Sequence, residues 1–156
     1  MGLFSKKENT IPDFNVTKRV GGFVEFDDDR KKWLIPDKKK APQVYAYGDI
    51  LDCDLLEDED SLTSGGLGRA LAGGVLFGGV GAIVGGITAK RKTKAIVKSM
   101  KIKITLNSIE TPIVYINLIN TPIKTDSMIY KTLDASAQEI LGIMAVILQQ
   151  NQAPAE

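Results

Sequence analysis

The sequence predicts an α+β domain in which a C-terminal helix covers an antiparallel sheet. Three observations support this prediction. Apolar and polar residues alternate in several short segments, the apolar spacing becomes helical from about Ser127, and an uncharged glycine-rich segment separates two groups of strands. The chain has 156 residues, enough for one hydrophobic core.

Three strands are expected near the N-terminus. Gly21–Phe26 and Lys32–Ile35 are rich in apolar and aromatic residues, and the polar residues 27–31 between them suit a hairpin turn. Val44–Tyr47 follows a second polar connection and is the third strand. Residues 1–16 are polar with few apolar anchors, so we expect a flexible leader there.

A fourth strand should follow directly. Leu51, Cys53 and Leu55 alternate with aspartates, which is typical of a half-buried strand. The alternation places Cys53 in the core, where a free cysteine behaves as a small apolar residue rather than as a reactive thiol.

Two longer strands are expected after the glycine-rich segment, over Lys94–Leu106 and Pro112–Ile119. The first of them has an apolar face formed by Met100, Ile102, Ile104 and Leu106. Its opposite face carries Lys101, Lys103 and Thr105.

The C-terminal helix is expected to begin after Asp126, a candidate N-cap residue. Its apolar stripe consists of Ile129, Leu133, Ala137, Ile140, Leu141, Met144, Ile147 and Leu148. We expect a single domain over residues 17–150 and a disordered tail over 151–156.

The composition excludes several kinds of chemistry. The chain is 44% hydrophobic and 25% charged with a net charge of +1, which is ordinary for a folded domain and gives no general reason to expect a polyanionic partner. It contains no histidine and one cysteine, which excludes Ser-His and Cys-His catalysis, intrachain disulfides and cysteine-cluster zinc sites. No spaced pair of acids stands out for general acid–base work. We therefore expect no catalytic residue, cofactor or metal.

Residues 65–90 carry the most informative pattern. Small residues recur at every fourth position and would form a stripe on one helical face, a glycine zipper that lets another backbone approach closely. The stripe consists of Gly66, Ala70, Gly74, Gly78, Ala82 and Gly86. The pattern points to close helix packing, to self-association as a homo-oligomer, or to membrane contact.

Topology decides how the glycine-rich segment is interpreted. Ala70–Ala89 carries no charge, and a continuous helix of this length would span about 30 Å, the thickness of a bilayer core. The flanking strands are expected in one sheet, however, so the chain must return to the side that it left. We therefore expect a helical hairpin over 65–90 that turns near Gly78–Gly81 and packs within the domain or between subunits. Partial membrane insertion and a true span are the alternatives.

Charges flank the glycine-rich segment with opposite sign. The acids at 57–60 precede it and would suit the N-terminus of a helix. Basic residues follow it and are either a solvated face or an anion site for lipid headgroups or nucleotide phosphates. The candidate anion-binding residues are Lys90, Arg91, Lys92, Lys98, Lys101 and Lys103. Nucleic acid is disfavoured as a partner, because few aromatic residues lie among the lysines.

Three segments carry a resemblance to bacterial pleckstrin-homology-like domains: YAYGDILDCDLLEDED, KSMKIKITL and PIVYINLI. The resemblance covers about residues 20–150 and implies a strongly bent antiparallel sheet, or a partly open barrel, that a C-terminal amphipathic helix plugs at one end. The whole pattern also resembles a family of small uncharacterised proteins from bacteria and their phages that insert a glycine-rich segment between these strands. That family implies no catalytic residues. Some members carry an N-terminal zinc ribbon, whose cysteines this chain lacks.

Two functions are consistent with these observations. The first is a non-enzymatic interaction domain that self-associates, or docks on a membrane, through the glycine-zipper hairpin. The alternative, which draws on the phage context of the resemblance, is a counter-defence protein that sequesters a nucleotide immune signal in a homo-oligomer. The first residues lack the apolar run of a secretory signal, so we expect the protein in the cytoplasm, where it could be peripheral to the membrane.

Overall fold

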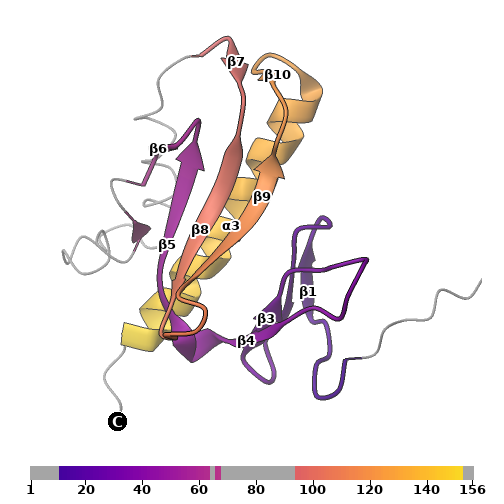
Figure 1. Ribbon diagram of the computed structural model, residues 1–156, viewed down its shortest axis with the longest axis vertical. Coiled ribbons are helices and arrows are strands. Elements are labelled where there is room, and N and C mark those ends of the chain that lie inside the picture. Colours follow the sequence, from indigo (N-terminus) through magenta and orange to yellow (C-terminus); the bar gives the residue numbers. More distant parts are fainter. Residues whose placement is uncertain (1–10, 64–65, 68–93, 153–156) are drawn as a thin grey trace, which may run out of the picture.

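The computed structural model describes residues 11–63, 66–67 and 94–152, and these confirm the α+β prediction (Figure 1). The described strands form three antiparallel sheets, which do not close into a barrel, and one long C-terminal helix packs against them. The sheets have the strand orders β1-β2-β3-β4, β6-β5-β8-β9 and β10-β7.

The first sheet contains the predicted hairpin but shifts its beginning. Its strands are β1 (Lys18–Val20), β2 (Val24–Asp27), β3 (Lys32–Leu34) and β4 (Val44–Ala46). The prediction of one strand over Gly21–Phe26 is wrong at its start, because Gly21 has a φ of +52° and lies in the turn between β1 and β2. Glycine adopts this conformation without a Cβ clash.

The second sheet brings together the strands on either side of the glycine-rich segment. It contains β5 (Ile50–Glu57), β6 (Asp60–Ser61), β8 (Met100–Leu106) and β9 (Ile113–Ile119). A short 3₁₀ helix, η2 (Tyr47–Asp49), leads into β5. β5 and β8 pair along their length, from Ile50 opposite Leu106 to Glu57 opposite Met100.

The predicted alternation is confirmed in β8 and corrected at the start of β5. All four apolar residues of the predicted β8 face are buried, and so is Cys53. Leu51 is 52% exposed, however, because the register of β5 shifts between Ile50 and Asp52. This bulge puts Ile50 in the core in place of Leu51.

The predicted strand Lys94–Leu106 is broken in two. β7 (Ile96–Val97) pairs with β10 (Ile123–Lys124) in a small separate sheet, and β8 begins only at Met100. Between β7 and β8, the backbone N–H groups of Lys98 and Ser99 donate to Oδ1 of Asp58 at 2.7 and 3.0 Å. A side chain from the β5–β6 turn therefore satisfies the backbone where the strand is interrupted.

The helix α3 (Met128–Gln152) begins two residues after Asp126, the proposed cap. Ser127 Oγ accepts the N–H of Tyr130 at 3.1 Å, so Ser127 and not Asp126 is the N-cap. The helix also passes the expected domain end at residue 150. There the side-chain amide of Asn151 donates to the carbonyl oxygens of Tyr47 at 2.8 Å and Ile50 at 3.2 Å.

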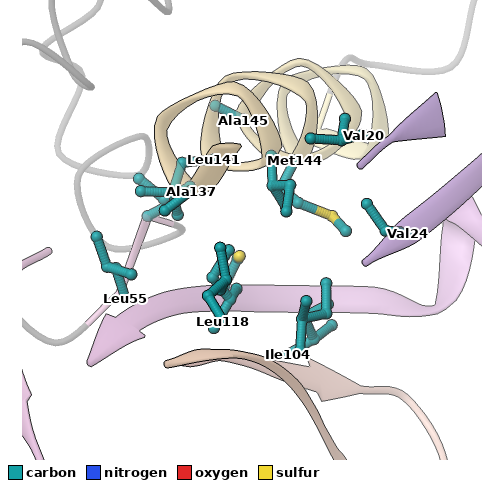
Figure 2. Packing of buried hydrophobic residues seen from close by; sticks show 14 of the residues in the cluster. Val20, Val24, Leu55, Ile104, Leu118, Ala137, Leu141, Met144 and Ala145 are labelled. Atoms are coloured by element: carbon teal, nitrogen blue, oxygen red, sulfur yellow. The ribbon is translucent and has the colours of Figure 1, made fainter. Parts of the chain in front are cut away.

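The apolar stripe of α3 faces the second sheet as predicted, with one exception. Ile129 is 64% exposed and lies outside it. Figure 2 shows Leu141 of α3 above Leu55 and Leu118 of the sheet, and Met144 beside Val20 and Val24 of the first sheet. The core therefore lies between the helix and both larger sheets. Its members on α3 are Tyr130, Ala137, Ile140, Leu141, Met144, Ala145, Ile147 and Leu148.

Asp27 is a buried acid that ties part of the predicted leader to the first sheet. Its carboxylate accepts the N–H of Asn15 at 2.8 Å, and the N–H and Nη1 of Arg30 at 3.1 and 3.2 Å. Burial alone would raise the pKa of Asp27, but these hydrogen bonds and the Arg30 charge outweigh it and hold the pKa below its ordinary value.

Asp27 predicts a loss of stability in acid. Its pKa is lower in the folded chain than in the unfolded chain, so its contribution is present above about pH 3.9, the ordinary value, and is lost as the pH falls through the folded pKa. Urea unfolding between about pH 7 and pH 3 measures this decline. Asp27→Asn should make the fall of the free energy of unfolding with pH shallower. Asp29→Asn, at an exposed position, is the matched control. Equal slopes for both variants would contradict the assignment.

Candidate functional site: the two ends of the glycine-rich segment

Most residues of the predicted zipper lie outside the described residues, and so do the three basic residues that directly follow it. These are Ala70, Gly74, Gly78, Ala82, Gly86, Lys90, Arg91 and Lys92. The structure describes the two ends of the glycine-rich segment, which are Gly66 and Leu67 at its start and the chain from Lys94 at its end. These two ends, with the β5–β6 turn between them, form the candidate site.

The start of the segment is fixed to β5 and to the core. Leu67 is 1% exposed and belongs to the main hydrophobic cluster. Gly66 has a φ of +134°, and a Cβ at this position would overlap the carboxylate of Asp52. The backbone conformation at position 66 therefore favours glycine, in addition to its predicted place in the zipper stripe.

Leu62 and Thr63, which follow β6, lie along the outer edge of β5. The N–H of Leu62 donates to the Leu55 carbonyl oxygen at 2.8 Å, and Thr63 Oγ1 accepts the N–H of Leu55 at 3.3 Å. The Thr63 hydroxyl also donates to Asp54. A threonine side chain thus takes the place of a backbone partner where the β5–β6 ladder ends.

The end of the segment is fixed to β10 and to the acidic turn. Thr125 Oγ1 donates to the Lys94 carbonyl oxygen at 2.5 Å, and the Thr125 N–H donates to the Ala95 carbonyl oxygen at 3.0 Å. Lys94 Nζ lies 3.3 Å from Asp58 Oδ2 and 3.8 Å from Asp60 Oδ2. The first described residue after the segment is therefore held by its backbone and by its charge.

The acids at 57–60 precede the glycine-rich segment as the closing turn of a hairpin, and the helix expected after them lies outside the described residues. Asp58 and Glu59 have φ values of +51° and +69° and connect Glu57 of β5 to Asp60 of β6. Two consecutive left-handed residues form the turn that matches the twist of a two-residue hairpin. Glu57 is buried and accepts the hydroxyl of Tyr130 at 2.9 Å, which links β5 to α3.

The acidic turn also engages part of the basic segment. Partial burial would raise the pKa of Asp58, but hydrogen bonds from Lys98 N–H, Ser99 N–H and Lys94 Nζ outweigh it and lower this pKa below 3.8. Glu59 Oε1 lies 2.9 Å from Lys101 Nζ. Acidic residues before the glycine-rich segment therefore pair with basic residues after it. In the sequence, only the opposite signs of the two groups indicate this pairing.

The three described candidate anion-binding lysines occupy two places. Lys101 and Lys103 share the outer face of β8, half-buried, whereas Lys98 is exposed in the turn before this strand. Lys101 Nζ also lies over the Tyr115 ring, 4.9 Å from its centre. Within the described ranges, Lys98 and Lys103 form no ion pair.

The described residues offer contacts rather than reacting groups. Burial first, and then the charges of Asp52 and Asp54, raise the pKa of Cys53 well above its ordinary value, so this thiol is neutral. Across residues 11–63, 66–67 and 94–152, no group of acids or cysteines is placed to hold a metal ion.

Whether a helix could span a membrane can be judged only for α3, the described helix. Within the part of the chain that the structure describes, no helix is both long enough and apolar enough to cross a bilayer.

Antiparallel sheets packed against a C-terminal helix, with a glycine-rich segment inserted between two paired strands, define a pleckstrin-homology-like domain. A domain of this class points to binding rather than catalysis. The chain belongs to the family of glycine-zipper-containing PH domains, which matches residues 9–120.

Two curated relatives come from one phage lineage. The chain is 27% identical over 147 residues to the "Immunity protein" of Bacillus phage SPbeta, an alignment that covers 88% of this chain and 73% of the relative. It is also 27% identical over 147 residues to the "SPbeta prophage-derived uncharacterized membrane protein YomJ" of Bacillus subtilis (strain 168). This second alignment covers 88% of the chain and 65% of the relative, so the chain spans about two thirds of its length. No solved structure matches the chain.

Proposed function

We propose that this protein is a non-enzymatic interaction domain that self-associates through its glycine-rich segment. The observation that carries the proposal is the pairing of β5 with β8, the strands that precede and follow the segment. Because these strands are neighbours, both ends of the segment lie on the same side of any membrane. A segment that leaves and returns in this way favours a hairpin over a single span.

The anchoring of the two ends supports the same proposal. Leu67 lies in the core and Lys94 is held by Thr125 and Asp58, so both described ends of the segment are fixed to the domain. Its small residues allow close backbone contact. Seven glycines between Ala70 and Ala89 would weaken an isolated helix by about 1 kcal/mol each relative to alanine, so a partner surface must compensate. A second copy of the segment supplies such a surface.

The family and the relatives give this domain a setting. The phage and prophage origin of the relatives supports a phage-related role. One relative is named a membrane protein. This supports, as a second role of the glycine-rich segment, contact with a bilayer.

Among the described lysines, the nucleotide-sequestration alternative would rest on Lys98 and Lys103, which form no ion pair there, rather than on Lys101. Lys101 is already paired with Glu59, so the charge that it could offer to a phosphate is largely met. Native mass spectrometry of the purified protein, with and without detergent, would report any bound nucleotide or lipid together with the subunit number.

The proposal predicts that bulky residues in the zipper reduce the size of the assembly. Gly74→Leu combined with Gly78→Leu places large side chains on the predicted stripe, so the molar mass from light scattering should fall and the membrane fraction should shrink. Gly48→Leu is the matched control, because nothing lies within 4 Å of a Cβ added at Gly48. A wild-type chain that is monomeric, or a double variant with unchanged mass, would contradict self-association through this segment.

A further inference from the structure

The strand β9 forms the outer edge of the second sheet. Among the described strands it is hydrogen-bonded to β8 alone, and Figure 1 shows it as the outermost arrow of that sheet. Its sequence, IVYINLI, contains no charged residue and no proline. Exposed strand edges in soluble proteins are usually interrupted by charges, prolines or bulges, because their unpaired backbone groups recruit another strand.

The hydrogen-bonding pattern identifies which backbone groups of β9 are unpaired. The N–H of Leu106 donates to the Pro112 carbonyl oxygen at 2.8 Å, so these two residues form a hydrogen-bonded pair. Such pairs alternate along an antiparallel ladder, and therefore the backbones of Val114 and Ile116 also face β8. The N–H and C=O groups of every second residue point away from β8. These residues are Ile113, Tyr115 and Asn117.

Side-chain exposure agrees with this assignment. Ile113 and Tyr115 are each 42% exposed and Asn117 is exposed, whereas Ile116 is buried. The irregularity in the β8–β9 register falls beyond Asn117, between the pairs Lys101–Asn117 and Met100–Ile119. Residues 113–117 therefore present a regular edge with no strand partner among the described residues.

We propose that β9 pairs antiparallel with β9 of a second copy of this chain, about a two-fold axis at Tyr115. In that register Ile113 lies opposite Asn117 of the other copy and Tyr115 lies opposite its own equivalent. Every outward N–H then meets an outward C=O, because the same edge is presented twice, as a two-fold interface requires. The two sheets become one continuous sheet.

No charge repulsion opposes the pairing of β9 with a second copy of itself. β9 brings no charge to the contact, so its own copy brings none against it. The nearest like charges on the outer face, Lys103 and its equivalent, would be separated by three strand spacings, or about 14 Å. This distance exceeds the screening length of about 8 Å at physiological salt. The Lys101 cation over the Tyr115 ring helps to hold the central aromatic pair in place.

Removing one outward N–H tests the pairing without disturbing β8. Tyr115→Pro deletes the N–H at the centre of the proposed contact, and proline is tolerated where this group points away from the sheet. In sedimentation velocity of the full chain, the variant should form a smaller assembly than the wild type, because only the zipper contact remains. Tyr115→Thr keeps the N–H and is the matched control, with little change expected.

A cysteine cross-link covers the case in which the proline variant does not fold. Paired residues that exchange backbone hydrogen bonds have Cα atoms about 5.5 Å apart, within disulfide range. Tyr115→Cys should therefore give a covalent dimer on mild oxidation, and the native Cys53 is buried. Leu51→Cys, exposed on β5, should give none. Equal or absent cross-linking at the two positions overturns the proposal.

The contact is independent of the zipper, and the experiment separates the two. In the background of Gly74→Leu with Gly78→Leu, the Tyr115→Cys cross-link should persist and Tyr115→Pro should convert a dimer to a monomer. A cross-link that disappears in this background overturns the β9 contact and leaves the zipper proposal intact. If the mass of the assembly is insensitive to the zipper substitutions but falls with Tyr115→Pro, the zipper proposal is overturned and the β9 contact is supported.

Discussion

Replacing Leu67 by alanine is expected to lower the free energy of unfolding by about 2–5 kcal/mol. Leu67 is 1% exposed and packs in the main core, although it lies at the very start of the glycine-rich segment. The substitution removes buried methyl groups and leaves a cavity that the surrounding strands fill only in part. Urea unfolding followed by circular dichroism measures the change as a shift of the midpoint at constant slope.

Leu51→Ala is the matched control for this substitution. It makes the same chemical change at a position that is 52% exposed, because the β5 bulge turns Leu51 out of the core. Its effect should lie within about 0.5 kcal/mol of zero. If the two variants were equally stable, Leu67 would not anchor the glycine-rich segment.

The second large effect is expected for Gly66→Ala, with a loss of about 1–3 kcal/mol from the backbone conformation alone. The φ of +134° at Gly66 is one that residues with a Cβ rarely adopt, and the added methyl group would also meet the Asp52 carboxylate. Both effects act on the folded state only. Thermal unfolding should therefore show a lower midpoint, and the shift should be larger than for a typical surface substitution.

Gly142→Ala should change stability in the opposite direction. Gly142 lies inside α3, and nothing lies within 4 Å of a Cβ added there. Alanine favours the helix over glycine by about 1 kcal/mol, so the unfolding midpoint should rise. A lower midpoint for Gly142→Ala would contradict the helical environment assigned to Gly142.

Elements with several repeats of a pattern could be predicted from the sequence. β8 alternates over seven residues and α3 repeats its apolar spacing over 25 residues, so both were identifiable. β6, β7 and β10 have two residues each, too few for alternation to be distinguished from chance. Their positions are fixed by partners far away in the sequence, such as Val97 opposite Ile123.

The candidate site was less predictable, because it depends on which loops meet. Composition shows acids before the glycine-rich segment and lysines after it, but not that Asp58 accepts the backbone N–H groups of Lys98 and Ser99. Asp58 and Glu59 are two left-handed residues in succession. The hairpin geometry imposes this conformation, and no glycine marks it in the sequence. Similarly, the bulge that exposes Leu51 becomes visible only when β5 is paired with β8.

The Asp58 carboxylate has a consequence for the length of the glycine-rich segment. Asp58 joins the turn before the segment to the turn after it, across 40 positions of sequence. The domain closes through this contact and through the β5–β8 ladder. The cost of enclosing the intervening chain grows only with the logarithm of its length, by about 0.6 kcal/mol for each doubling. The segment can therefore be shortened or extended at small energetic cost, which makes its reach an adjustable property of a fixed scaffold.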